Sequence, residues 1–280
     1  MTQASVSLDD QYHNEDSKNN VNKVEKIERE WAIAIKAAAQ RHSDIDASIV
    51  SDLEYLQYAI FTQGNVPDAL KRLALVQDFK RRYGIHDDGS WEEGIRDLET
   101  FLRAFPDYLC SFGIHPGDQS CFSCLRPVES PNGAPENVPV FMRFWFYHCQ
   151  ATQSSIATMR AGVVTFADMR GMTCRHFAPQ IKKELGKLFG SYPVRNKSAV
   201  LIHMNYVARL FIFFFNLFRT DNKPEKFTCY RNAKIFLNHS FVPPNLLPPR
   251  YGGTMDDERL RASLLENLQA RYRLAETFTL

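Results

Sequence analysis

The residues best suited to metal binding or thiol chemistry lie in the middle of the chain, where Cys121 and Cys124 form a Cys-x-x-Cys pair. His148 and Cys149 follow downstream and complete a set of four candidate ligands for a zinc ion. The spacing does not favour such a site, because residues i and i+3 of a strand point to opposite faces of a sheet. The adjacent His148 and Cys149 are also poorly placed for joint chelation from a helix. We therefore expect no metal ion, and the sequence predicts no other cofactor.

Candidate catalytic groups lack partners as well. His203 falls in an apolar stretch, which is more typical of a hydrogen-bonded core histidine than of a general base. No serine or cysteine stands in an evident pattern with an acid and a base, and the chain has neither a glycine-rich phosphate loop nor a Gly-x-Ser-x-Gly turn. We predict that the protein is not an enzyme.

Charge and composition indicate which class of partner and which cellular compartment to expect. The net charge of the 280-residue chain is only +2, so no strong overall field favours nucleic acid. Residues 1–22 are polar and lack the apolar core of a secretory signal. We therefore expect a cytoplasmic protein whose six cysteines are reduced thiols.

Helical periodicity dominates the N-terminal part of the chain. Residues 1–22 are predicted to be a disordered tail, and residues 23–106 a helical N-terminal domain. Ser51 or Asp52 caps one expected helix, Pro67 opens the next at its first turn, and Gly84 ends it. The expected helices begin near residue 24 and cover 51–62, 66–83 and 91–105.

After Pro116, short apolar runs alternate with helical segments, which predicts βαβ units and a mostly parallel sheet. The expected strands cover 120–128, 162–168, 199–204 and 226–230, and the expected helices cover 138–159, 173–189, 206–218 and 233–240. Residues 255–280 are predicted to form a charged, helical C-terminal tail. The predicted fold class is α/β, with a helical N-terminal subdomain followed by a mostly parallel sheet flanked by helices.

The most apolar segment, residues 199–218, includes six bulky apolar residues in a row at 210–215. Three interpretations compete for the helix expected here. A transmembrane helix would place Arg209 near the bilayer centre, at a cost of roughly 2.5–3.5 kcal/mol. A buried core helix and a helix that covers an apolar cavity both explain a surface that is apolar on every side. Hydropathy alone does not separate these last two.

The flanking motifs separate them, because they occur together and in order. Downstream, Leu247–Thr254 (LPPRYGGT) resembles the segment that closes CRAL-TRIO domains. Upstream, the Tyr192-Pro193 turn before the apolar strand, the glycine-flanked segment Gly162–Met172, Leu125–Val128 and the helix pair Leu53–Leu70 are similar to successive parts of the same family. Five motifs in the same order make the resemblance to the CRAL-TRIO family specific over residues 25–254.

The resemblance implies a lipid-binding domain over residues 107–254, in which the sheet forms the floor of a closed apolar pocket. It implies that helix 206–218 is a gate and that Asp168 is a structural residue at a strand end. The residues that the resemblance assigns to the pocket and gate are Phe144, Val164, Phe166, Ile202, Met204, Leu210, Phe211, Phe214, Phe215 and Phe218.

Departures from the family pattern select a branch. The phosphatidylinositol-transfer branch carries Pro-Glu-Arg where this chain has Pro193-Val194-Arg195, and an arginine-rich helix end where this chain has Gln57. The likeness is greater to the branch that includes the α-tocopherol transfer protein and cellular retinaldehyde-binding protein. In that branch an external basic patch binds phosphoinositides, and the matching or adjacent residues here are Arg195, Lys197, Lys223 and Lys226. Solvated surface charge is an equal explanation for these four.

Two functions follow as hypotheses. In the first, the protein binds and transfers a hydrophobic small molecule such as a retinoid or tocopherol, and docks peripherally on anionic, phosphoinositide-containing membranes. In the second, the domain does not transfer a ligand, and acts as a regulatory module whose charged termini recruit a protein or membrane partner.

Overall fold

The computed structural model of this chain describes residues 23–86, 91–131, 134–173, 176, 179–206, 209, 227–230 and 242–280. Helices come first and are followed by alternating strands and helices, which is an α/β architecture. The predicted fold class is therefore confirmed. The helices are α2 (Lys26–Ala39), α3 (Asp52–Thr62), α4 (Val66–Tyr83), α5 (Trp91–Ala104), α6 (Asn137–Ala151), α7 (Ile156–Ala161), α8 (Pro179–Ser191) and α11 (Asp257–Thr277).

A five-stranded sheet in the order β1-β2-β3-β4-β5 forms the centre of the α/β part. Its strands are β1 (Leu109–Ile114), β2 (Cys121–Leu125), β3 (Val163–Asp168), β4 (Asn196–Ile202) and β5 (Phe227–Tyr230). β1 is antiparallel to β2, and the other neighbours are parallel. The sequence pattern did not predict β1, because this strand is buried along nearly its whole length and shows no apolar–polar alternation.

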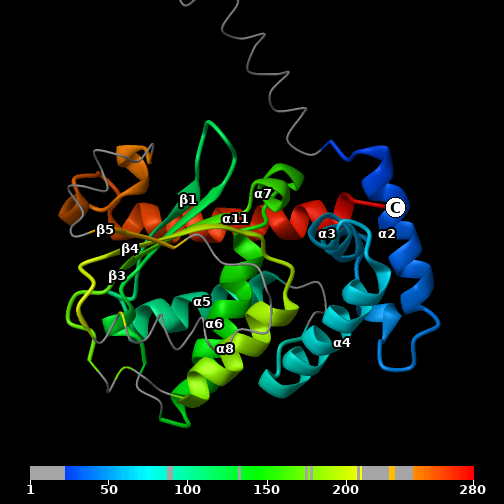
Figure 1. Ribbon diagram of the computed structural model, residues 1–280, viewed down its shortest axis with the longest axis horizontal. Coiled ribbons are helices and arrows are strands. Elements are labelled where there is room, and N and C mark those ends of the chain that lie inside the picture. The colour runs from blue at the N-terminus through cyan, green and yellow to red at the C-terminus, as the bar shows by residue number, and fades with distance from the viewer. Residues whose placement is uncertain are drawn as a thin grey trace, which may run out of the picture.

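The two faces of this sheet are covered by different parts of the chain. On the first, the α6 face (Cys121, Ser123 and Leu125 of β2), the Ser123 hydroxyl lies 3.0 Å from Nε2 of His148 in α6. Helices α5, α6 and α8 gather on this side (Figure 1). On the second, the Tyr251 face, the rings of Phe166 and Tyr251 are 5.2 Å apart. This second face is where strand residues meet the segment that follows β5.

The N-terminal helices begin and end where the sequence predicts. Ser51 and Glu54 form a capping box at the start of α3, and Asn65 caps α4 with Pro67 in its first turn. Gly84 ends α4 in the left-handed conformation. In α2, however, the buried side includes Glu28, which forms an ion pair with Arg160 of α7.

The prediction of one long helix over residues 138–159 is wrong, because the helical conformation is interrupted between α6 and α7. The Thr152 hydroxyl donates to the carbonyl oxygen of Cys149 (2.7 Å), at the end of α6. Ser155 then accepts from the main-chain NH of Thr158 and caps α7. Hydroxyl side chains that bond to the local backbone compete with a continuous helix, which explains the break.

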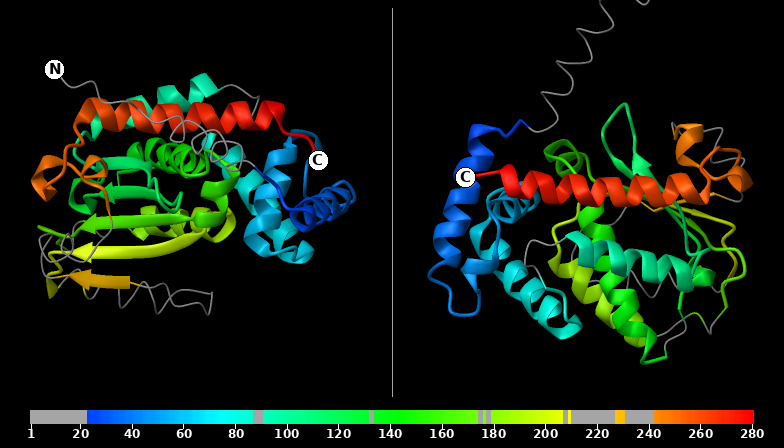
Figure 2. Two further views of the ribbon diagram at one scale, coloured as in Figure 1. Left: turned by 90° about the horizontal axis from the view of Figure 1, so that it is seen from above. Right: turned by 180° about the vertical axis from the view of Figure 1, so that it is seen from behind.

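Helix α11 is part of the core rather than a free tail. It runs along the molecule from the sheet to α3, as Figure 2 shows. Leu260, Leu264, Leu268 and Tyr272 of α11 are buried. Arg271 is only 4% exposed and donates from Nη2 to Oε1 of Gln57 in α3 (2.7 Å). The C-terminal helix therefore joins the sheet to the N-terminal helices.

Candidate functional site

Three of the residues predicted to line a pocket share the Tyr251 face. Val164 and Phe166 of β3 alternate with residues of the α6 face, and Ile202 lies at the same side of β4, in register with Asp168. Phe166 and Ile202 are buried, whereas Val164 is half-buried. Phe122 of β2 joins them, with its ring 6.3 Å from that of Phe166. The period-2 pattern of the expected strand already contained Phe122, but the sequence analysis did not select it.

The other predicted pocket residues are not brought to this face. Phe144 lies in α6 and stacks on Phe101 of α5 with ring centroids 3.9 Å apart, so it is on the α6 side of the sheet. Met204 packs with a small separate cluster that contains Met169 and Leu201. The remaining predicted pocket and gate residues, Leu210, Phe211, Phe214, Phe215 and Phe218, lie outside the described residues, as does most of helix 206–218.

Asp168 closes the Tyr251 face at the carboxyl end of β3. Its carboxylate is 4% exposed and accepts hydrogen bonds from the Tyr251 hydroxyl (2.7 Å), the Arg170 main-chain NH (3.0 Å) and Nδ1 of His203 (3.0 Å). Burial acts to raise the pKa of Asp168, but these hydrogen bonds lower it below its ordinary value. The carboxylate therefore stays ionised and ties the LPPRYGGT segment to the sheet, in agreement with a structural role.

Two glycines let the LPPRYGGT segment fold back on itself. Gly252 has φ of 85°, in the left-handed region that glycine occupies without strain. At Gly253, an added Cβ would lie 2.0 Å from the carbonyl oxygen of Leu247 and 2.4 Å from that of Pro244. Glycine at these two positions therefore lets the segment present Tyr251 to Asp168 without strain or a backbone clash.

The predicted basic patch lies at the opposite edge of the sheet, where β4 begins. Arg195 and Lys197 are both exposed and two residues apart. Nη1 of Arg195 donates to the carbonyl oxygen of Arg160 (3.2 Å), and Lys197 forms an ion pair with Asp118 in the turn between β1 and β2. Lys223 and Lys226, the other two predicted patch residues, lie outside the described residues.

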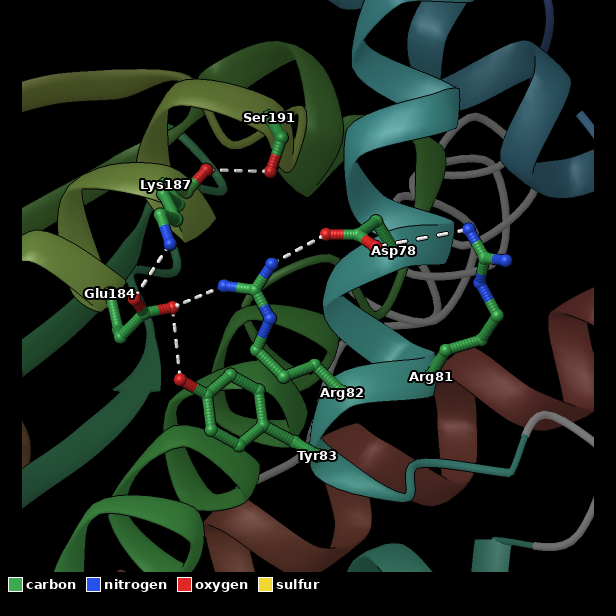
Figure 3. Close-up of polar contacts among 7 residues, drawn as sticks. All are labelled: Asp78, Arg81, Arg82, Tyr83, Glu184, Lys187 and Ser191. Atoms are coloured by element: carbon green, nitrogen blue, oxygen red, sulfur yellow. Dashed lines mark hydrogen bonds and ion pairs between the residues drawn. The ribbon is translucent and has the colours of Figure 1, made fainter. Parts of the chain in front are cut away.

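A polar network between α4 and α8 positions the chain that enters this edge (Figure 3). Glu184 of α8 is buried and accepts from the Tyr83 hydroxyl (2.9 Å), Nη1 of Arg82 (3.0 Å) and Nζ of Lys187 (2.7 Å). Burial acts to raise the pKa of Glu184, but these hydrogen-bonding partners lower it. One helical turn beyond Lys187, Ser191 leads into the Tyr192-Pro193 turn, so the network holds the chain that leads into β4.

The groups that suggested metal or acid–base chemistry do not come together as one site. The four candidate zinc ligands, Cys121, Cys124, His148 and Cys149, are all buried. Burial lowers the pKa of His148 to about 3, so its ring is neutral. Within the described ranges, no group of three or more histidine, cysteine, aspartate or glutamate side chains is placed to hold a metal ion. The same ranges contain no helix that is long and apolar enough to cross a bilayer.

The structure also has an open hollow of about 670 Å³ that the sequence analysis did not anticipate. It lies where β1 meets the LPPRYGGT segment and the start of α11. Its lining residues are Cys110, Pro248, Pro249, Arg250, Met255, Asp256, Asp257 and Glu258. None of these belongs to the predicted pocket or gate, so the hollow is a separate feature.

Comparison with known proteins gives a consistent result. Residues 124–253 match the model of the CRAL/TRIO domain family. A mouse (Mus musculus) protein named alpha-tocopherol transfer protein-like is 27% identical over 176 residues, which cover 59% of this chain and 50% of that protein. The proteins of the same name from Pongo abelii and Homo sapiens are 26% identical over the same share of each chain. This chain thus spans about half the length of the curated relatives it matches.

Proposed function

From the match of residues 124–253 to the CRAL/TRIO domain family, whose domains bind lipids, we propose that the chain binds and transfers a hydrophobic small molecule or lipid. The cargo is a retinoid, a tocopherol or a molecule of similar shape and polarity. The protein acts as a carrier rather than as an enzyme, in the cytoplasm and at the surface of membranes. Tocopherol enters this proposal through the printed name of the relatives.

The single observation that carries the proposal is the apolar Tyr251 face within the matched residues. Val164, Phe166 and Ile202 present apolar side chains on one side of a parallel sheet, and Phe122 extends this surface. At about 25 cal/mol for each Å² of apolar surface buried, enclosing a long apolar ligand there contributes several kcal/mol after the entropy costs of binding. In the proposal, helix 206–218 is the gate that covers this face.

Native mass spectrometry of the purified chain tests the proposal. We expect a mass above that of the polypeptide, from a co-purified apolar ligand, or uptake of retinol, tocopherol or phospholipid from mixed micelles. Val164→Trp adds bulk to the Tyr251 face and is expected to reduce uptake, whereas Ile33→Trp, on an exposed side of α2, leaves it unchanged. A chain that takes up none of the three ligands would contradict the proposal.

Docking on anionic membranes is the second part of the proposal. Arg195 and Lys197 are exposed at one edge of the sheet, and in the proposal Lys223 and Lys226 act with them. Each basic residue near an anionic surface contributes about 1 kcal/mol to binding. Vesicle co-sedimentation should show weaker binding of Arg195→Glu plus Lys197→Glu to phosphoinositide vesicles, with Arg41→Glu plus Lys71→Glu as a charge-matched control. Equal binding by both double variants would rule the patch out.

The alternative is a regulatory module whose charged residues 1–22 and 256–280 recruit a partner. The apolar side of α11 is buried against β1, α5 and α6, so a partner would meet only the polar side of this helix. The carrier proposal uses the apolar Tyr251 face, which the alternative leaves without a role.

A further inference from the structure

Two thiols meet at an irregularity in the β1–β2 pairing. Leu109 pairs with Leu125 and Ser111 pairs with Cys124, so Cys110 is the extra residue of a bulge. A bulge sets two residues of one strand opposite one residue of its partner, which here places Cys110 next to the Ser111–Cys124 pair. The Cys110 and Cys124 side chains are in hydrogen-bond contact. The pairing therefore holds two reduced cysteines side by side across neighbouring strands.

The two thiols differ in access. Cys110 is 5% exposed, but it lines the open hollow of about 670 Å³ described above. Cys124 is fully buried behind it. A small reagent that enters the hollow therefore meets Cys110, whereas Cys124 has no exposed surface and does not line the hollow.

The surroundings make Cys110 the more acidic of the two thiols. The hydrogen bond with Cys124 lowers the pKa of Cys110, and the guanidinium groups of Arg250 and Arg126 lower it further, against the opposing effects of burial and Asp107. Burial and the neighbouring Cys110 raise the pKa of Cys124 well above its ordinary value. In its thiol form Cys110 donates to the carbonyl oxygen of Asp107 (3.5 Å).

From the bulge, the contact and the hollow, we propose that Cys110 and Cys124 are a peroxide-sensitive dithiol that closes reversibly into a disulfide. The Cys110 thiolate attacks one oxygen of a hydroperoxide, the O–O bond breaks, and Cys110 becomes a sulfenic acid as the other oxygen leaves as hydroxide or alkoxide. The Cys124 sulfur then attacks the Cys110 sulfur, the S–O bond breaks, and water leaves with the Cys124 proton. Each sulfur loses one electron, and the peroxide gains two.

The charge around the hollow selects the oxidant. Asp256, Asp257 and Glu258 line it with three carboxylates, against the single guanidinium of Arg250. This net negative rim disfavours anionic oxidants such as glutathione disulfide, and it does not repel uncharged hydrogen peroxide. The proposal is therefore specific to a small, uncharged hydroperoxide.

The chain contains its own control pair. Cys121 and Cys149 are also buried neighbours, one on β2 and the other on α6, but neither lines the hollow. Burial raises the pKa of Cys149 to about 12. Close approach of two cysteines alone would predict oxidation of both pairs, whereas the proposal predicts oxidation of the Cys110–Cys124 pair alone.

The test uses the full chain with Cys174→Ser and Cys229→Ser, which leaves four of the six cysteines. The protein is treated with hydrogen peroxide, then denatured and alkylated, and its mass is measured. We expect a loss of about 2 Da from formation of one disulfide, with two alkylated thiols remaining. Digestion before Asp107 and Asp118 places Cys110 in one peptide, and Cys121, Cys124 and Cys149 together in the next, which ends before Asp168. A cross-link between the two peptides therefore shows that Cys110 is bonded, and single-cysteine variants identify its partner.

Further variants assign the partners. Cys110→Ser and Cys124→Ser should each abolish the cross-link, Cys124→Ala provides a second substitution at the buried position, and Cys149→Ser should leave the cross-link intact. Glutathione disulfide at the same concentration should give at least roughly 10-fold slower reaction of Cys110. Four alkylated thiols after peroxide, a Cys121–Cys149 bond, or oxidation of Cys110 to sulfinic acid without a cross-link would each overturn the proposal.

Discussion

Two aspartates at opposite ends of the strands of this sheet have different structural roles. Asp168, at the carboxyl end of β3, is 4% exposed and accepts from a hydroxyl, a main-chain NH and an imidazole. Asp118, in the turn at the other edge, has a side chain that is 48% exposed and an ion pair with Lys197, which is 40% exposed. If a donor to the buried Asp168 carboxylate is removed, water cannot take its place. The exposed Asp118 carboxylate can instead be solvated by water when its ion pair with Lys197 is lost, at little cost in free energy. Asp168 is therefore a structural clamp, because it holds the LPPRYGGT segment on the sheet. Asp118 is a removable screen, because it neutralises Lys197 of the proposed membrane patch.

The largest expected effect is that of Asp168→Ala. This variant leaves the buried Tyr251 hydroxyl without its acceptor and should lower the free energy of unfolding by about 3–4 kcal/mol. Urea denaturation followed by circular dichroism measures it. Asp118→Ala is the matched control and should cost less than about 1 kcal/mol. Similar losses for the two variants would contradict the distinction between clamp and screen.

Tyr251→Phe removes one donor and keeps the ring against Phe166. The expected loss is about 2 kcal/mol, because one hydrogen bond to a buried charge is removed while two others remain. The same denaturation experiment measures it. If Tyr251→Phe proved as stable as the unmodified chain, the hydrogen bond between Tyr251 and Asp168 would not stabilise the fold.

The contribution of Asp168 to the free energy of unfolding should depend on pH. The pKa of Asp168 is lower in the folded chain than in the unfolded one, so below about pH 4 the unfolded state binds more protons. Its contribution is therefore present above the unfolded pKa of about 3.9 and is lost as pH falls through the folded value. Denaturation at pH 6 and pH 3 should show that Asp168→Asn differs most from the unmodified chain at pH 6. A difference that grew toward pH 3 would reverse the assigned sign.

The smallest expected change in stability accompanies a gain in binding. Asp118→Asn should alter the free energy of unfolding by less than about 1 kcal/mol. It frees Lys197 and removes a negative charge, so binding to phosphoinositide vesicles should strengthen by roughly 3- to 5-fold at low salt. Asp44→Asn, an exposed position between α2 and α3, is the charge-matched control. Unchanged binding of Asp118→Asn, with weaker binding of Arg195→Glu plus Lys197→Glu, would show that Asp118 does not screen the patch.

Local signals in the sequence were sufficient for the helices that carry their own caps. The bounds of α4 follow from Asn65, Pro67 and Gly84, which act within one turn of the chain. β1 depends instead on tertiary context, because it is buried along nearly its whole length. The break after α6 rests on local bonds from Thr152 and to Ser155, which the spacing of apolar residues does not reveal. Short-range periodicity contains neither fact.

The residues of the candidate site also fall into those that local sequence patterns place and those that only tertiary packing places. Val164, Phe166 and Ile202 share a face because strand residues alternate, and this follows from their numbers once the strands are known. Phe144 lies on the other side because α6 packs against Ser123 and its neighbours, a choice between two faces that a helix sequence does not specify. The pairing of Lys197 with Asp118 likewise joins residues 79 positions apart, through a turn next to the missed strand β1.

The placement of α11 has a consequence for how the chain is made. Its Arg271 contacts Gln57 across 214 positions, and its apolar side covers β1, α5 and α6. A ribosome therefore releases every other element of this core before the helix that seals it is complete. Until then the surfaces that meet α11 stay uncovered and accessible to chaperones, and the final fold forms only after α11 has been translated.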